Sequence, residues 1–423
     1  MLATPEIIEE FAQPHQLAAV LPRWMEAVPL YARPQTSSYP DKFRSEVDLL
    51  RSFPLMTKRE IRDDFPRNFL GPEVELDALA EDPTIELEHT SGTLEERTPL
   101  LLPRGWWAEQ ERRALLLNPV VAKLLTEEPD ARRVTISSPV CTSEVCYTGV
   151  PSRDERTVGN TLFLSLSRFP FLWSQQDLAR MVAEAVEWQP RFLDLDPVYG
   201  VVFALYCERH HLRIPSLCFI VCSYEYVSVV HRCILERVFG VPVFDLYGST
   251  ETGHLLMEDA AGQMRPSLQT ALLESINTDE LGIAELVVTT LSNHVMPLIR
   301  YRIGDLVEKL ELPFGSRYVL HGRVADAFST SRNLRVTTRQ VDLCLAGVSG
   351  IAHYQFQERR TGPWVLRYVP DGSGPTAESL NGLRERLSGV LALRDEVRIE
   401  RADLLLAGGS GKFRLCYPDG STS

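Results

Sequence analysis

The amino-acid sequence predicts an α/β protein with more than one domain. Segments with helical and strand-like apolar patterns alternate between residues 176 and 239. The strand-like segment at residues 217–222 is apolar throughout, which is typical of a strand buried on both faces of a layered sheet. The chain has 423 residues, which exceeds the size that one hydrophobic core usually supports.

The first helix with a clear start follows residues 53–57. Thr57 occupies the capping position and Glu60 stands three residues later, the spacing of a capping box. We therefore expect a short helix after Thr57. The first fifty residues are interrupted by prolines and predict little.

A longer helix is predicted over residues 176–189, with Pro190 ending it. A buried strand is predicted over residues 217–222, between Pro215 and Ser223. The apolar face of the helix is expected to contain Leu178, Met181, Val182, Ala185 and Val186.

The next helix is predicted over residues 227–239 and ends at Gly240, and a strand follows over residues 241–247. Ligands of layered α/β sheets bind at the carboxyl ends of strands, so residues 247–251 are candidate site residues. The buried side of this helix is expected to contain Val230, Cys233, Ile234 and Val238.

Two half-buried strands of a smaller sheet are predicted over residues 285–290 and 306–312, where apolar and polar residues alternate. From about Asp326 the pattern changes, and a final α+β domain of about a hundred residues is expected. Its predicted helices cover residues 340–348 and 378–391, and its predicted strands cover residues 364–369 and 397–401.

Composition and charge argue against several classes of function. The net charge of -13 opposes the basic surface that a nucleic-acid-binding protein needs. We expect no membrane partner and a cytoplasmic location, because the chain shows neither a membrane-length apolar run nor an export signal. The eight cysteines form no CxxC pair and are expected to be reduced, with no metal site built from protein ligands alone.

Lysine is rare in this chain. Five of the 44 basic residues are lysines, and all the others are arginines. One of the five, Lys412, follows the small residues Gly408–Gly411. An ammonium group is more compact than a guanidinium group, so a lysine chosen here indicates a specific role.

Two blocks carry residue types that can hold a nucleotide. Residues 245–253 read Asp-Leu-Tyr-Gly-Ser-Thr-Glu-Thr-Gly, and residues 296–305 end in Arg-Ile-Gly-Asp. Together they resemble the nucleotide-binding core of the adenylate-forming enzymes, with the motif sequences found in the phenylacetate–CoA ligases and their relatives. Gly322-Arg323 and the glycine-flanked Lys412 resemble two further motifs of that family, and Thr57-Lys58 resembles its entry segment.

The resemblance implies a fold and a reaction. We expect a large N-terminal layered α/β domain over residues 1–324 that binds ATP and an acid, and a small mobile α+β lid domain over residues 325–423. Enzymes of this family join a carboxylate to the α-phosphate of ATP, release pyrophosphate, and pass the acyl group to an acceptor. The implied cofactors are ATP and Mg²⁺, and coenzyme A is one candidate acceptor.

The resemblance also implies roles for single residues. Lys412, Thr250 and Glu251 are the catalytic candidates, and Glu251 holds the magnesium. Tyr247 packs against adenine and Asp305 accepts the ribose hydroxyls. The other nucleotide-binding candidates are Thr90, Ser91, Gly92, Thr93, Ser223, Glu225, Asp245, Gly248, Ser249 and Arg323. The candidates for the acid-binding pocket are Tyr224, Tyr226 and Phe244.

Two segments depart from the family pattern. Leu94-Glu95-Glu96 replaces the Thr-Gly-Lys of the phosphate loop, and Arg97 stands one place later. Carboxylates near a polyanion repel it, so Arg97 is expected to act as the cation while the glutamates turn outward. Ala325 stands where the family has a hinge aspartate, and the turn glycine that lines the route of coenzyme A is absent. This second departure argues against coenzyme A as the acceptor more than it argues against adenylation.

Four functions are compatible with these residues. The expected one is ATP-dependent adenylation of a small, aromatic carboxylic acid, with transfer to an acceptor such as coenzyme A. The alternatives are an adenylating ligase with an amine or carrier-protein acceptor, a diazotising ligase that activates nitrite, and a nucleotide-binding protein without turnover. The identity of the acid and the formation of a homodimer are left open.

Overall fold

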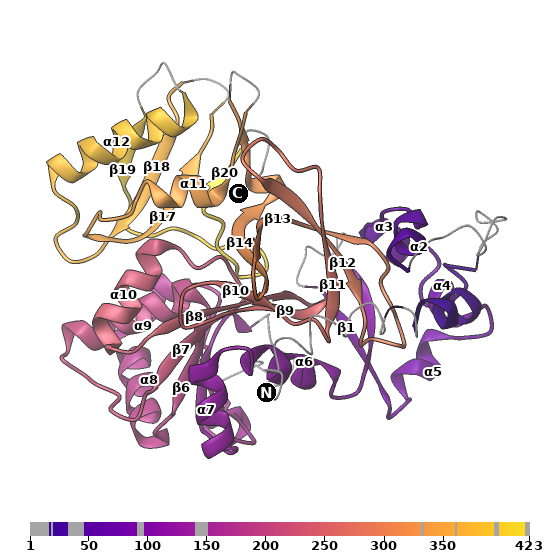
Figure 1. The fold of residues 1–423 in the computed structure, drawn as a ribbon. Helices are drawn as coiled ribbons and strands as arrows, with labels where there is room; N and C mark the ends of the chain where they lie inside the picture. Colours follow the sequence, from indigo (N-terminus) through magenta and orange to yellow (C-terminus); the bar gives the residue numbers. More distant parts are fainter. Residues whose placement is uncertain are drawn as a thin grey trace. The chain divides into compact units, whose positions relative to one another are not determined.

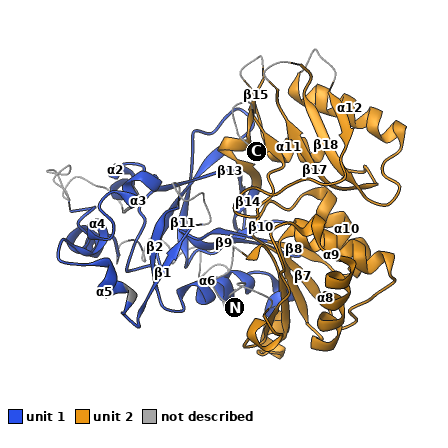
Figure 2. Ribbon diagram, turned by 180° about the vertical axis from the view of Figure 1, so that it is seen from behind, with its two compact units in different colours: residues 1–122, 246–319 blue, residues 123–245, 320–423 orange. Residues whose placement is uncertain are grey.

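The structure is a computed structural model that describes residues 17, 20–32, 46–90, 97–139, 151–330, 334–359, 362–392 and 397–418. The chain divides into two compact units (Figure 2). Unit 1 combines Met1–Ala122 with Leu246–Val319, and unit 2 combines Lys123–Asp245 with Leu320–Ser423. Each unit is therefore built from two separate stretches of the chain.

Unit 2 contains the predicted alternation of strands and helices (Figure 1). Its strand order is β8-β7-β6-β3-β5-β4, with parallel neighbours from β8 to β5 and an antiparallel β4 at the end. The strands are β3 (Arg133–Ile136), β4 (Thr157–Val158), β5 (Thr161–Phe163), β6 (Phe192–Leu195), β7 (Phe219–Cys222) and β8 (Val243–Ser249), whose last four residues belong to unit 1. The helices are α8 (Gln175–Trp188), α9 (Pro197–Arg209) and α10 (Val229–Phe239).

The C-terminal stretch of unit 2 adds a second sheet of order β19-β18-β17-β20. Its strands are β17 (Ile351–Gln357), β18 (Val365–Pro370), β19 (Arg398–Arg401) and β20 (Cys416–Tyr417). Helices α11 (Thr338–Leu343) and α12 (Ala377–Leu391) accompany it, and the short β15 (Phe328–Ser329) pairs with β16 (Arg335–Val336).

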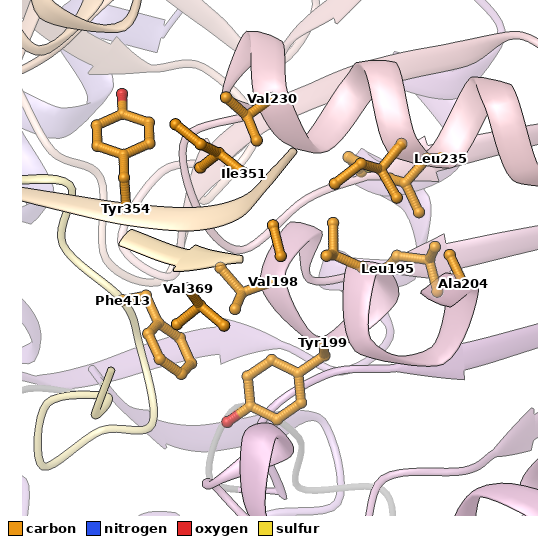
Figure 3. Close-up of a cluster of buried hydrophobic side chains, with 14 of the residues drawn as sticks. Leu195, Val198, Tyr199, Ala204, Val230, Leu235, Ile351, Tyr354, Val369 and Phe413 are labelled. Atoms are coloured by element: carbon orange, nitrogen blue, oxygen red, sulfur yellow. The ribbon is translucent and has the colours of Figure 1, made fainter. Parts of the chain in front are cut away.

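One apolar core joins the two stretches of unit 2. Val198 of α9 and Val230 of α10 belong to the same buried cluster as Ile351 and Tyr354 of β17 (Figure 3). Phe413, which follows Lys412 directly, also lies in this cluster. The residues around Lys412 are thus packed into the core of unit 2.

Unit 1 carries the remaining strands in the order β11-β12-β13-β14-β10-β9-β8, together with a hairpin of β1 (Ile85–His89) and β2 (Pro99–Pro103). The strands are β9 (Gly253–Glu258), β10 (Met264–Pro266), β11 (Ala271–Ile276), β12 (Ile283–Thr290), β13 (Tyr301–Leu312) and β14 (Gly315–Arg323), which ends in unit 2. The helices are α2 (Glu46–Ser52), α3 (Lys58–Arg62), α4 (Arg67–Leu70), α5 (Leu76–Ala80), α6 (Trp106–Leu115) and α7 (Pro119–Glu127), which continues into unit 2.

Most of the predicted elements are confirmed within two residues at each end. They include α8, α10, α12, β7, β8, β12, β18 and β19. The capping box is also confirmed, since the amide of Thr57 donates to Glu60 at 2.7 Å. The α/β fold class follows from the same elements, whereas the separate lid domain over residues 325–423 stays a prediction.

Three expectations about elements and faces are wrong. The helix predicted over residues 340–348 ends at Leu343, and the chain then turns toward Gly347, which has a φ of +77°. The strand predicted from Leu306 begins five residues earlier, at Tyr301. Val186 and Cys233 are exposed although they were placed on buried faces, because they lie at the edges of those apolar stripes.

A buried pair of histidines connects α10 to β17 within unit 2. Nε2 of His231 lies 3.1 Å from Nδ1 of His353, and the two rings are stacked. Burial lowers the pKa of His231 to about 3, and burial together with the charge of His231 lowers the pKa of His353 as well. Both rings are therefore neutral at physiological pH.

We expect this pair to make the folded state less stable in acid. The unfolded chain takes up protons below about pH 6.5 while the folded chain does not, so stability falls as pH falls through that value. For His231 the loss reaches about 2 kcal/mol at pH 5. The stability advantage of the wild type over His231→Gln should therefore shrink by about 2 kcal/mol between pH 7.5 and pH 5.0 in urea unfolding.

Comparing the wild type with His231→Gln at each pH removes the contribution of the buried carboxyl groups to the pH dependence of stability. The pKa values of these carboxyl groups are raised, so their contribution acts in the opposite direction to that of the histidines. Exposed His294 provides the control, as His294→Gln. If the difference in unfolding free energy between the wild type and His231→Gln stays constant with pH, His231 is protonated in the folded protein at pH 5.0.

Candidate functional site

The first block of candidate residues forms a tight hairpin in unit 1. β8 ends at Ser249 and β9 begins at Gly253, so Thr250 and Glu251 lie in the turn. A Cβ at Gly248 would stand 2.3 Å from the carbonyl oxygen of Gly253, so only glycine fits there. The hydroxyls of Ser249 and Thr252 lie 3.0 Å apart and close the turn.

The second block meets the first in the same unit. The hydroxyl of Tyr247, on β8, donates to Oδ2 of Asp305, on β13, at 2.7 Å. These side chains are separated by 58 positions in the sequence. The aromatic ring and the carboxylate that the resemblance assigns to adenine and ribose are therefore neighbours.

Glu251 is a buried carboxylate with a cation beside it. Only 6% of its surface is exposed, the hydroxyl of Tyr301 donates to its Oε1 at 3.0 Å, and Nζ of Lys58 lies 3.3 Å from the same oxygen. Burial alone would raise the pKa of Glu251, but the charge of Lys58 and hydrogen bonds from Ser249 and Tyr301 bring it below its usual value. Glu251 is therefore ionised at neutral pH.

Lys58 reaches Glu251 because the segment before α3 runs beside β13. The amide of Met56 donates to the carbonyl of Arg300 at 3.0 Å, and the amide of Arg302 donates to the carbonyl of Met56 at 2.8 Å. The capping box then starts α3 at Lys58. Lys58 and Tyr301 were not among the predicted site residues, although the rarity of lysine was a usable signal for Lys58.

Thr90 lies at the base of the predicted phosphate loop in unit 1. It is buried, and its hydroxyl accepts a hydrogen bond from the amide of Thr98 at 3.0 Å. This contact holds together the two ends of the segment. Ser91, Gly92, Thr93, Glu95 and Glu96 lie outside the described residues.

A second group of candidates gathers at the carboxyl ends of β6 and β7 in unit 2. Asp194 is buried and accepts hydrogen bonds from Ser223 at 3.0 Å, from the phenol of Tyr224 at 3.0 Å and from Thr135 at 3.3 Å. Tyr224 has a φ of +75°, which is rare for a residue with a side chain. Its hydrogen bond to Asp194 therefore holds the ring of a strained residue.

Glu225, Asp196 and Lys412 influence one another electrostatically. Burial, and the charge of Asp196, raise the pKa of Glu225 well above its usual value, and the charge of Lys412 acts in the opposite direction. Burial raises the pKa of Asp196 to about 7, again opposed by the charge of Lys412. Lys412 therefore lies within electrostatic reach of two buried carboxyl groups of unit 2.

The remaining candidates of unit 2 occupy varied positions. Arg323 is exposed at the end of β14, and its charge acts on Glu225 and Asp326. Asp245 pairs with Cys222 between β8 and β7. Phe244 is buried against Phe219, and half-buried Tyr226 packs on the apolar core. Their predicted roles stay predictions.

Asp194 and Asp196 were missed by the sequence analysis. Both follow apolar residues in the run Phe192-Leu193-Asp194-Leu195-Asp196, and an acidic residue at the end of a buried strand is the signal that could have found them. The alternation of apolar and acidic residues hid this strand from a search for continuous apolar runs.

Glu251 fits the magnesium that the resemblance implies. Mg²⁺ is bound through oxygen atoms, often by one or two carboxylates together with substrate phosphates. The described residues contain no group of three His, Cys, Asp or Glu that could hold a metal ion alone. An ionised, buried carboxylate such as Glu251 suits a metal that a nucleotide brings with it.

Comparison with solved structures shows which fold this is. The chain superimposes on a 2-hydroxyisobutyryl-CoA ligase in complex with R3-HIB-AMP with a TM-score of 0.69, 18% identity, and coverage of 97% of this chain and 89% of that chain. This chain has the fold of the adenylate-forming CoA ligases. The anthranilate CoA ligase AuaEII in complex with anthranoyl-AMP gives a TM-score of 0.54, with 13% identity over 77% of this chain and 65% of that chain.

Further comparisons agree with the fold. A benzoate CoA ligase from Burkholderia xenovorans LB400 matches with a TM-score of 0.52 and 16% identity, over 79% of this chain and 69% of that one. Protein CapK from Staphylococcus aureus is 35% identical over 90 residues, which make up 21% of this chain and only 20% of CapK. No protein-family model matches the sequence. In the described part of the adenylate-forming fold, no helix has both the length and the apolar character needed to cross a membrane.

Proposed function

We propose that this protein is an adenylate-forming ligase that uses ATP to activate a small, aromatic carboxylic acid and then transfers the acyl group to the thiol of coenzyme A. The observation that carries the proposal is the group formed in unit 1 by Tyr247, Asp305, Glu251 and Lys58. It combines an aromatic ring, two carboxylates and an ammonium group, drawn from three separate parts of the chain.

The first half-reaction joins the acid to AMP. A carboxylate oxygen of the acid forms a bond to the α-phosphorus of ATP, and the bond from that phosphorus to the bridging oxygen of pyrophosphate breaks. Asp305 holds the ribose through its hydroxyls, and Tyr247 stacks on the adenine. Glu251 would hold magnesium together with the phosphates, and the metal would supply positive charge to the departing pyrophosphate.

The second half-reaction transfers the acyl group. The thiolate of the acceptor attacks the acyl carbon, and the bond to the AMP oxygen breaks. We choose coenzyme A because the solved relatives in this fold are CoA ligases. We choose an aromatic acid because Tyr224 and Tyr226 follow the carboxyl end of β7 in unit 2.

Exchange of labelled pyrophosphate into ATP tests the first half-reaction. We expect exchange that depends on one class of acid in a panel of aromatic acids, aliphatic acids and nitrite. Trapping with hydroxylamine, with and without coenzyme A, then tests the acceptor, because coenzyme A should divert the adenylate into a thioester. Nucleotide binding without exchange across the whole panel would instead support a protein without turnover.

A further inference from the structure

The ammonium group of Lys58 lies against the carboxylate that fits magnesium. Its Nζ is 3.3 Å from Oε1 of Glu251, and the hydroxyl of Tyr301 donates to the same oxygen at 3.0 Å. All three residues belong to unit 1. One oxygen of Glu251 is therefore already in contact with a cation and with a hydrogen-bond donor.

Arg300 fixes the chain that leads to Lys58. Its guanidinium group donates to the backbone carbonyls of Arg51 at 3.0 Å and Phe53 at 2.8 Å, and to the carboxylate of Glu274 at 3.2 Å. Arg300 has a φ of +52°, which residues with a side chain rarely adopt. An arginine held in a strained conformation therefore binds the segment before α3 to the start of β13.

The two partners of the ion pair differ in exposure. The side chain of Lys58 is 42% exposed, whereas that of Glu251 is 7% exposed. An exposed ammonium group loses little when it turns into water, but a buried carboxylate without a cation is energetically costly. Lys58 can therefore leave Glu251 when another cation takes its place.

A divalent metal ion and Lys58 compete for the same oxygen of Glu251. Positive charges that are a few ångströms apart repel one another strongly near a protein surface. The ion pair also carries no net charge, so it attracts a free metal ion weakly. A nucleotide changes this balance, because its phosphates bring negative charge and further oxygen ligands for the metal.

We propose that Lys58 competes with the metal for Glu251 and thereby makes metal binding depend on the nucleotide. Without a nucleotide, the ammonium group stays on Oε1 and a free divalent ion binds weakly. With a nucleotide, Lys58 turns into solvent and leaves the carboxylate to the metal. This inference rests on the proposed function, which assigns the metal to Glu251.

Binding of Mn²⁺ to Lys58→Met, in the absence of nucleotide, tests the competition. Mn²⁺ prefers the same oxygen ligands as Mg²⁺, and its electron paramagnetic resonance signal reports the free ion. Methionine removes the charge and is a good helix former at the start of α3. We expect this variant to bind Mn²⁺ about tenfold more tightly than the wild type, because the repulsion is gone. Lys58→Gln serves if the methionine variant does not fold.

Lys309→Met is the matched control. Lys309 lies on β13 in the same unit and forms an ion pair with Glu311 at 2.6 Å, but Glu311 keeps 69% of its side chain exposed. Its replacement should leave the binding of Mn²⁺ unchanged. Adding Glu251→Gln to Lys58→Met should remove the gain in affinity, because the carboxylate that Lys58 released is then absent.

Two outcomes would overturn the competition. One is an affinity of Lys58→Met for Mn²⁺ that equals or falls below that of the wild type. The other is a gain in affinity that persists after Glu251→Gln is added, because the metal would then bind elsewhere. Pyrophosphate exchange tests the proposed function separately. A gain in Mn²⁺ affinity that depends on Glu251, in a protein that exchanges no pyrophosphate with any acid, would uphold the competition and reject adenylation.

Discussion

Replacing Lys412 with alanine is expected to slow adenylate formation by about 10²-fold or more, the loss seen when one charge-stabilising group is removed from an active site. The ammonium group would neutralise the charge that accumulates when a carboxylate attacks the α-phosphate. Arginine at this position should not restore the rate, because its planar fork is larger than an ammonium group and Gly411 and Phe413 leave the loop packed on both sides. Pyrophosphate exchange at saturating ATP and acid measures the effect.

Lys123→Ala is the control for this prediction, because Lys123 is an exposed lysine on α7. It should exchange pyrophosphate at the wild-type rate. Binding of ATP to Lys412→Ala should persist, since Tyr247 and Asp305 remain. If Lys412→Ala forms the adenylate as fast as the wild type, Lys412 has no role in that step.

Replacing Glu251 with glutamine is expected to lower the exchange rate by a similar factor, about 10²-fold. Glutamine has the same shape but carries no charge, so it binds Mg²⁺ poorly. The variant should also require more magnesium to reach its half-maximal rate. A titration of the exchange rate with magnesium, at fixed ATP, separates this effect from a general loss of activity.

The stability of Glu251→Gln should change less than its activity. Lys58 keeps about 42% of its side chain exposed, so solvent can take over its charge when the carboxylate is gone. Glu109→Gln on α6 is the control, because that carboxylate forms ion pairs with Arg112 and Arg113 on the helix surface. An unaltered magnesium requirement in Glu251→Gln would mean that the metal is held elsewhere.

Local patterns sufficed for most of the secondary structure. The capping box at Thr57 and the apolar faces of α8 and α10 depend on residues three or four positions apart, and such signals are contained in a short window of sequence. The helix predicted over residues 340–348 failed because its apolar pattern continues past the point where Gly347 turns the backbone. Periodicity records which residues are apolar and does not record where the chain must turn.

The candidate site residues also divide into those that local motifs predict and those that only the fold reveals. Tyr247, Asp305, Glu251 and Lys412 were predicted from motifs in which neighbouring residues restrict one another, and the structure brings Tyr247 to within 2.7 Å of Asp305. Lys58 and Asp196 have no motif around them that reveals a role. Lys58 becomes meaningful only through Glu251, which is far away in the sequence, and Asp196 only through its burial at the start of α9.

The sequence by itself therefore determined the α/β class, the principal helices and strands, and the two blocks that meet at Tyr247 and Asp305. Only the tertiary structure decided which charges stand together. Burial strengthens electrostatic interactions and makes an unpaired carboxylate energetically costly. Whether a given carboxylate is buried, however, depends on strands and helices that lie hundreds of residues away in the sequence. Glu251 owes its partner Lys58 to that packing, and both Glu251 and Asp196 owe their altered pKa values to it.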